Sequence, residues 1–233
     1  MIEILKNLFN KYNINYDDEK LSKLRKFYKL VIEANQVMNL TGITEEKEFA
    51  IKNILDSVLP LNTIPKNSTL VDVGAGAGFP SVPIKILRPD LNIVMVDSLN
   101  KRVKFLNSAI EKLNLQNITA VHSRAEDFAQ KNRERFDVSV ARAVAKLDTL
   151  AEYCLPLVKV GGLFIAYKSL KAEEEIIEAT KCLDTLGGKV SHLQNVMVKE
   201  IDSIRINIVI KKVKQTPLMY PRGKNLPKTN PIC

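Results

Sequence analysis

The sequence contains little cysteine and histidine, and it has no long apolar run. Its three cysteines, Cys154, Cys182 and Cys233, are scattered along 233 residues, which favours reduced thiols in a cytosolic protein over a disulfide framework. Two histidines and no CxxC pair argue against a zinc site. No apolar run approaches the roughly 20 residues that span a bilayer, and polar residues interrupt the first ten positions, which argues against a signal peptide. We therefore expect a cytoplasmic protein with no metal site and no membrane association.

Acidic residues are also absent after Asp202, although the whole chain has a net charge of +9. Seven cations follow that position: Arg205, Lys211, Lys212, Lys214, Arg222, Lys224 and Lys228. A solvated basic tail would explain this pattern. The same concentration of charge is the electrostatic footprint of a phosphate-rich partner. Charge alone does not distinguish a nucleic acid from an anionic membrane surface.

Apolar spacing divides the chain into a helical first part and an alternating remainder. Helical periodicity covers Asp18–Met38 and a second stretch from about Thr44 to Leu59. A segment with two prolines, PLNTIPKNS, then interrupts the pattern and is typical of a linker. We therefore expect residues 1–60 to form an N-terminal helical extension. Residues 61–233 would form the main domain with its basic C-terminal tail.

In the main domain, short apolar strands alternate with helical segments. Strands are predicted at 69–73, 92–97, 117–122, 136–142 and 161–168, and helices at 79–87, 100–115, 145–158 and 171–186. The alternating segments 189–198 and 203–213 predict a terminal hairpin. Repeated strand–helix units indicate an α/β fold with a mostly parallel sheet and helices on both faces.

A glycine-rich loop follows the first predicted strand. The string DVGAGAGFP places Gly74, Gly76 and Gly78 shortly after Asp72, and ligands of doubly wound sheets bind beyond the carboxyl ends of the strands. A dinucleotide fingerprint would need its third glycine at position 79, but the bulky Phe79 stands there. This departure counts against NAD. The glycines by themselves are a weak signal.

Acidic residues also follow the next two predicted strands. Asp97 lies 23 residues after Gly74, where a carboxylate can accept hydrogen bonds from both hydroxyls of a ribose. After the third strand, Glu126 or Asp127 could accept a hydrogen bond from the amino group of adenine. Helix capping is the alternative explanation for each of these acids. Together with Asp72 and the glycine loop, they describe a pocket for an adenosine that carries a neutral or cationic group. S-adenosylmethionine has this chemistry.

Longer strings resemble one methyltransferase family. The order of the motifs is similar to that of the class I (Rossmann-like) methyltransferases. More specifically, this chain resembles the RsmG (GidB) family in six strings: MNLTGIT (38–44), NILDSV (53–58), DVGAGAGFPSVPI (72–84), VDSLNKRVKFL (96–106), ARAVAKLDTL (141–150) and the ending YPRGKNLPKTNPI (220–232). That family methylates the N7 of a guanine in 16S ribosomal RNA. The resemblance implies a Rossmann-like fold, S-adenosylmethionine as cofactor, and 16S rRNA or a small-subunit particle as partner.

The resemblance also assigns site residues. It implies cofactor contacts by the glycine loop, by the segments after the second and third strands, and by the arginine of ARAVA: Gly74, Gly76, Phe79, Asp97, Ser98, Leu99, Ala125, Glu126 and Arg142. For the RNA we expect Arg142, Lys168, Tyr220 and Arg222, with a solvated side chain as the simpler alternative for Lys168. The chain departs from the family at Asn53, where we expect histidine, and at Asn225, where we expect glycine.

The target chemistry requires no catalytic base. The N7 of a neutral guanine carries a lone pair and no proton, so transfer depends on its alignment with the methyl group, and we assign no catalytic residue. The fourth strand lacks the Asn/Asp-Pro-Pro-aromatic motif of amine methyltransferases, and Cys154 is expected to be a core residue. Two alternatives stay open: an NAD-dependent oxidoreductase, and an RNA-binding or assembly protein with a vestigial pocket. For the oligomeric state we favour a monomer.

Overall fold

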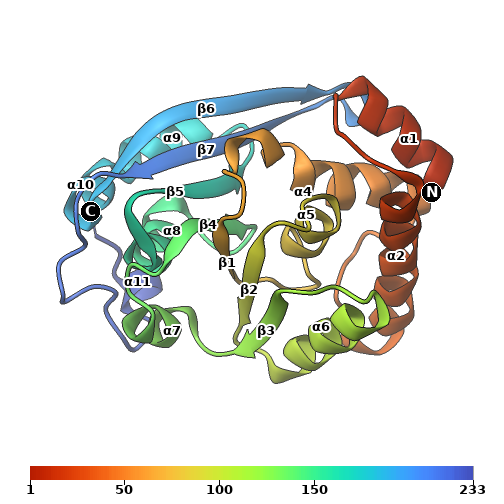
Figure 1. The fold of residues 1–233 in the computed structure, drawn as a ribbon. Coiled ribbons are helices and arrows are strands. Elements are labelled where there is room, and N and C mark those ends of the chain that lie inside the picture. The colour runs from red at the N-terminus through yellow and green to blue at the C-terminus, as the bar shows by residue number, and fades with distance from the viewer. Residues whose placement is uncertain (233) are drawn as a thin grey trace.

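A seven-stranded sheet forms the centre of the molecule in a computed structural model, which describes residues 1–232 (Figure 1). The spatial order of its strands is β3-β2-β1-β4-β5-β7-β6. They are β1 (Thr69–Val73), β2 (Asn92–Asp97), β3 (Ile118–His122), β4 (Phe136–Arg142), β5 (Val158–Lys168), β6 (Gly188–Val198) and β7 (Ser203–Lys212). The first five strands pair in parallel, whereas β7 is antiparallel to both β5 and β6. The predicted mostly parallel sheet and terminal hairpin are confirmed.

Helices cover both faces of the sheet, as the strand–helix alternation predicts. One face carries α5 (Ser81–Leu87) and α6 (Asn100–Lys112), together with the N-terminal helices. The other face carries α7 (Ala125–Lys131), α8 (Leu147–Cys154), α9 (Ala172–Glu178) and α10 (Thr180–Leu186). Neighbouring residues of β1 show the division, because Leu70 belongs to the first buried cluster and Val71 to the second. A final short helix, α11 (Leu226–Thr229), lies beside α7 and α8 (Figure 1).

The N-terminal part consists of α1 (Ile2–Lys11), α2 (Asp18–Met38) and a broken helix. That helix begins with α3 (Glu46–Phe49), continues as a π-helix (Ala50–Leu55) and ends with α4 (Asp56–Val58). Its N-cap is Glu45, whose carboxylate accepts hydrogen bonds from two backbone N–H groups of the first turn. The helix therefore begins close to the predicted Thr44.

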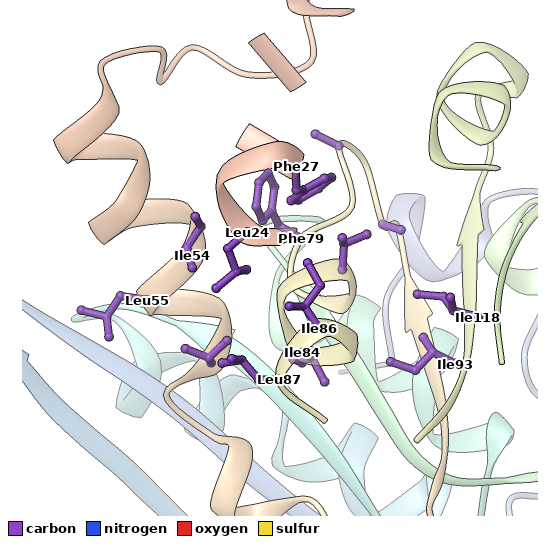
Figure 2. Packing of buried hydrophobic residues seen from close by; sticks show 14 of the residues in the cluster. Leu24, Phe27, Ile54, Leu55, Phe79, Ile84, Ile86, Leu87, Ile93 and Ile118 are labelled. Atoms are coloured by element: carbon purple, nitrogen blue, oxygen red, sulfur yellow. The ribbon is translucent and has the colours of Figure 1, made fainter. Parts of the chain in front are cut away.

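The N-terminal helices share a hydrophobic cluster with one face of the sheet. Figure 2 shows Phe27 and Ile54 beside Phe79 of the glycine loop, with Ile84 of α5 and Ile93 of β2 further along. The division of the chain into an extension (1–60) and a main domain (61–233) stays a prediction. Among residues 1–232, no helix combines the length and apolar character that crossing a membrane requires.

All four predicted helices of the main domain end or begin at other residues in the structure, and two of them differ in more than their end residues. The segment 145–158 forms α8 only to Cys154, because Pro156 lacks an N–H and a 3-10 turn replaces the last helical turn. Strand β5 consequently begins at Val158 rather than at residue 161. The segment 171–186 divides into α9 and α10, with Ala179 between them.

Candidate cofactor and substrate site

One cavity in the described part of the chain has a volume of about 500 Å³. It lies at the carboxyl ends of the parallel strands, next to the junction of β1 and β4 where the strand order reverses. Its size suits a small molecule, for which cavities of roughly 300–1,000 Å³ are usual. Eight of the nine residues predicted to bind a cofactor line it: Gly74, Gly76, Phe79, Asp97, Ser98, Ala125, Glu126 and Arg142. Leu99 does not.

The glycine loop forms the floor of the cavity, and it depends on glycine at two positions. Gly74 has φ of +80°, and a Cβ there would lie 2.6 Å from Cγ2 of Val144. Gly78 has φ of +97°, and a Cβ there would lie 2.9 Å from a methyl carbon of Val82 and 3.1 Å from the ring of Phe27. Any other residue would collide with these neighbours and would strain the backbone. Gly74 therefore packs closely against Val144 in the cavity wall, whereas Gly78 packs against side chains of the core.

Asp97 joins the glycine loop to the end of β2. The residue is only 4% exposed. Its Oδ2 accepts a hydrogen bond from the backbone N–H of Gly76 at 2.9 Å, and its Oδ1 accepts one from the N–H of Leu99 at 2.8 Å. Arg102 lies 3.6 Å from Oδ2. Leu99 rather than Asp97 is the N-cap residue of α6, so this carboxylate organises the wall of the cavity and is not the helix cap that was the alternative explanation.

Glu126 stands at the far end of the cavity, in the first turn of α7. The residue is 2% exposed. Its Oε1 accepts a hydrogen bond from Nε of Arg124 at 2.9 Å and a longer one from the backbone N–H of Asn225 at 3.3 Å. Asn225 and Lys228 both line the cavity. The C-terminal tail therefore forms part of this wall.

Arg142 ends β4 at the opposite end of the cavity. Its Nη1 donates to the carbonyl of Lys52 at 2.9 Å and to Oδ2 of Asp56 at 3.0 Å, and its Nη2 donates to Oδ1 of Asn53 at 3.1 Å. Its guanidinium carbon lies 5.2 Å from the centre of the Phe79 ring. The π-helix (Ala50–Leu55) contains both Lys52 and Asn53. Arg142 thus attaches the N-terminal helices to the edge of the cavity.

Asp72 lies in β1, directly before the glycine loop, and is completely buried. Burial raises the pKa of its carboxyl from 3.8 to about 7, although the nearby charge of Arg142 acts in the opposite direction. Asp72 does not line the cavity. Its carboxyl can therefore influence the site only indirectly, through the glycine loop that follows it in the chain.

Three residues predicted to contact RNA do not line the cavity. Nζ of Lys168 donates to the carbonyl of Ala145 at 2.7 Å and pairs with Glu175 at 2.6 Å. The side chain of Lys168 is 8% exposed, so the alternative of a solvated lysine is wrong. Arg222 pairs with the buried Glu152 at 2.7 Å, and its guanidinium carbon lies 5.9 Å from the ring of Tyr220.

Other residues that line the cavity are not predicted from the sequence as site residues. Thr149 and Tyr153 come from α8, and Asn225 and Lys228 come from the tail. The spacing of the α8 residues is that of an ordinary core helix and carries no signal of a ligand. For Asn225 the sequence does contain a signal, which is the glycine expected at this position. In the structure Asn225 has φ of +60°, a conformation that glycine also favours. The expected glycine at this position therefore indicates a left-handed backbone, which asparagine also tolerates.

Comparisons with known proteins support one family. The model of the family "rRNA small subunit methyltransferase G" matches residues 20–204. The ribosomal RNA small subunit methyltransferase G of Desulforamulus reducens is 46% identical over 233 residues, which cover 98% of this chain and 97% of that protein. The protein of the same name from Lactobacillus acidophilus is 47% identical over 229 residues, with 96% and 95% covered.

Solved structures share the fold at low sequence identity. M. jannaschii TYW2 in complex with AdoMet is similar with a TM-score of 0.56 and 16% identity, over 69% of this chain and 76% of that one. A SAM-dependent methyltransferase from Aquifex aeolicus is similar with a TM-score of 0.54 and 17% identity, over 71% and 93%. These similarities support the class I methyltransferase fold.

Proposed function

The chain belongs to the rRNA small subunit methyltransferase G family, and from this premise we propose that it methylates the N7 of a guanine in 16S rRNA with S-adenosylmethionine. The observation that carries the proposal is the cavity at the carboxyl ends of the strands. The glycine loop and two buried carboxylates, Asp97 and Glu126, line it. We propose that the protein acts in the cytoplasm as a monomer.

The residues of the cavity fit S-adenosylmethionine better than a dinucleotide. Pyrophosphates bind at helix N-termini through backbone N–H groups. Helix α5, which follows the glycine loop, has Pro80 as its N-cap and Pro83 in its first turn, and neither residue has an N–H to donate. Of the four cations in the wall, three already face carboxylates, namely Arg102, Arg124 and Arg142, and the fourth is Lys228 of the tail. A cofactor without phosphates meets these conditions.

The proposed roles follow from the contacts of each residue. Asp97 would accept from the ribose hydroxyls and Glu126 from the adenine amino group, while the glycine loop, Phe79 and Arg142 would border the methionine portion. When bound, S-adenosylmethionine supplies an electrophilic methyl group on its sulfonium. The protein needs no base to remove a proton, because the attacking N7 of guanine carries none. Its task is to exclude water and to hold the target base in line.

The predicted RNA residues would act partly through the loops that they hold. Lys168 binds the carbonyl of Ala145 in the loop after β4, and Arg222 attaches the tail to α8. Lys224 and Lys228 are exposed on the same tail, and Lys228 carries its charge to the cavity. We propose that the tail contacts RNA phosphates, and RNA affinity should then fall steeply with salt.

Methyl labelling tests the proposal. Purified protein is incubated with labelled S-adenosylmethionine and either naked 16S rRNA or small-subunit particles that lack the modification. We expect incorporation at one guanine, located by chain cleavage at N7-methylguanosine. Label at another atom, or in neither substrate, would contradict the proposal. RNA binding without any transfer would instead favour the vestigial-pocket alternative.

A further inference from the structure

The C-terminal segment, defined here as residues 220–230, is fixed over α7 and α8 by contacts with side chains of those helices. Nε2 of Gln130 donates to the carbonyl of Pro221 at 3.1 Å, and Oγ1 of Thr149 donates to the carbonyl of Pro227 at 3.1 Å. Arg222 donates from Nε and Nη2 to the two carboxylate oxygens of Glu152 at 2.9 and 2.7 Å. The segment is therefore attached near its beginning, at Pro221 and Arg222, and at its short helix, at Pro227.

Asn225 lies between these attachments in a left-handed conformation, with φ of +60° and ψ of 15°. Most residues avoid this conformation, whereas glycine and asparagine accept it. The backbone N–H of Asn225 donates to Oε1 of Glu126 at 3.3 Å. Its side-chain Oδ1 accepts from Nη2 of Arg124 at 3.3 Å. Asn225 thus contacts both members of the Arg124–Glu126 ion pair.

These contacts restrict Glu126 on one side only. Its Oε1 receives two donors, from Arg124 and from Asn225. No hydrogen bond from residues 1–232 reaches the other oxygen, Oε2, even though Glu126 is buried and lines the cavity. Within the described chain, the buried side-chain oxygens that have no partner do not include Oε2 of Glu126, so this oxygen is accessible from the cavity. A donor from a ligand in the cavity would satisfy it.

We propose that Asn225 is a positioning residue of the cofactor site: its left-handed backbone directs an N–H at Oε1 of Glu126 and so reserves Oε2 for the amino group of adenine. The identity of this ligand rests on the function proposed above. The C-terminal segment then has two tasks, because the basic tail that is proposed to contact RNA also completes the adenine end of the cofactor site.

The test measures the affinity for S-adenosylhomocysteine, the demethylated cofactor, by calorimetry on three variants. Asn225→Gly keeps the left-handed backbone and its N–H, and should bind within about twofold of the unaltered protein. Asn225→Val disfavours that backbone, because β-branched residues avoid positive φ, and should lower the affinity roughly tenfold as the charge-assisted bond is lost. The matched control is Asn114→Val, at an exposed asparagine with φ of +50° after α6, far from the cavity wall. It should leave the affinity unchanged.

A second ligand separates positioning from a structural effect. S-inosylhomocysteine has a carbonyl oxygen where adenine has its amino group, so position 6 of its ring offers Oε2 an acceptor in place of a donor. The unaltered protein and Asn225→Gly should prefer S-adenosylhomocysteine, whereas Asn225→Val should lose most of this preference. Equal weakening of both ligands in Asn225→Val, or an unchanged affinity, would overturn the inference. An unaltered protein that binds neither ligand would instead overturn the proposed function.

Discussion

Different kinds of interaction hold the two ends of the cavity in place. At the Arg142 end, the wall rests on an apolar cluster of three rings, Phe27, Phe49 and Phe79, all at most 6% exposed. The ring of Phe79 lies 5.3 Å from that of Phe27 and 5.5 Å from that of Phe49. At the Glu126 end, the wall is the C-terminal segment, and its attachments are hydrogen bonds and the Arg222–Glu152 ion pair.

Because of this difference, the Arg142 end of the cavity contributes to the stability of the fold and the Glu126 end contributes mainly to binding. The apolar cluster is continuous with the core that covers one face of the sheet (Figure 2), so that end cannot loosen without damage to the whole fold. The C-terminal segment buries little apolar surface besides Pro227 and Pro221, and segments of this kind open at lower free energy than core elements. We therefore expect mutations at the first end to act on global stability, and mutations at the second end to act on binding.

The largest effect is expected for Phe27→Ala. Removal of this completely buried ring leaves a cavity beneath Phe79, and such substitutions lower the free energy of unfolding by about 3–5 kcal/mol. Urea denaturation measures the change. Val37→Ala on the same helix is the matched control, because Val37 is 83% exposed, and it should change stability by less than about 0.5 kcal/mol. A loss below about 1 kcal/mol for Phe27→Ala would show that this end is not part of the core.

Asp72, under the glycine loop, should make stability depend on pH. Its pKa is about 7 in the folded protein against 3.8 for an ordinary aspartate, so between these values the folded state binds more protons than the unfolded state. The stabilising contribution of the protonated Asp72 carboxyl is therefore fully present below pH 4. It is lost as the pH rises through 7. Asp72→Asn removes this dependence. The variant should gain on the order of 2–4 kcal/mol relative to the unaltered protein between pH 4 and pH 8. Parallel stability profiles of the two proteins would refute the raised pKa.

At the Glu126 end, Arg222→Ala should loosen the C-terminal segment. The substitution leaves Glu152, 1% exposed as a side chain, without its cation, which lowers the free energy of local opening of the segment by about 1–3 kcal/mol. Limited proteolysis should then cut the tail before the fold is lost. Lys214→Ala breaks an exposed pair with Asp184 and should have almost no effect. Global unfolding of Arg222→Ala without early tail cleavage would remove the distinction between the two ends.

The smallest effect is expected for single tail lysines. Lys228→Ala should weaken RNA binding about threefold and lower the salt slope by roughly one unit, as the loss of one phosphate contact predicts. Cofactor affinity should stay the same. Lys224→Ala, four positions earlier and outside the cavity wall, is the charge-matched comparison. A change in cofactor affinity with Lys228→Ala alone would assign that lysine to the cofactor instead of the RNA.

The sequence indicates the part of the site that strand order brings together. Asp97 and Glu126 follow consecutive parallel strands, so their meeting beside the glycine loop could be predicted. Asn225 lies 99 residues after Glu126, and no periodicity connects them. Lys168 ends strand β5 and pairs with Glu175 of the following helix, α9, and the residue pattern does not indicate this contact either. The π-helix that supplies acceptors to Arg142 also gives no signal in the residue pattern, because its residues read as an ordinary amphipathic helix.

The central claim is that the cavity between these two ends holds S-adenosylmethionine. Calorimetry with the unaltered protein and Asp97→Ala tests it most directly, with NAD as the competing ligand and circular dichroism to confirm that the variant is folded. We predict one molecule of S-adenosylmethionine bound per chain, no binding of NAD, and an affinity at least about tenfold weaker in the variant, because two ribose hydroxyls lose their acceptor. Binding of NAD, or an unchanged affinity in a folded Asp97→Ala, would contradict the account.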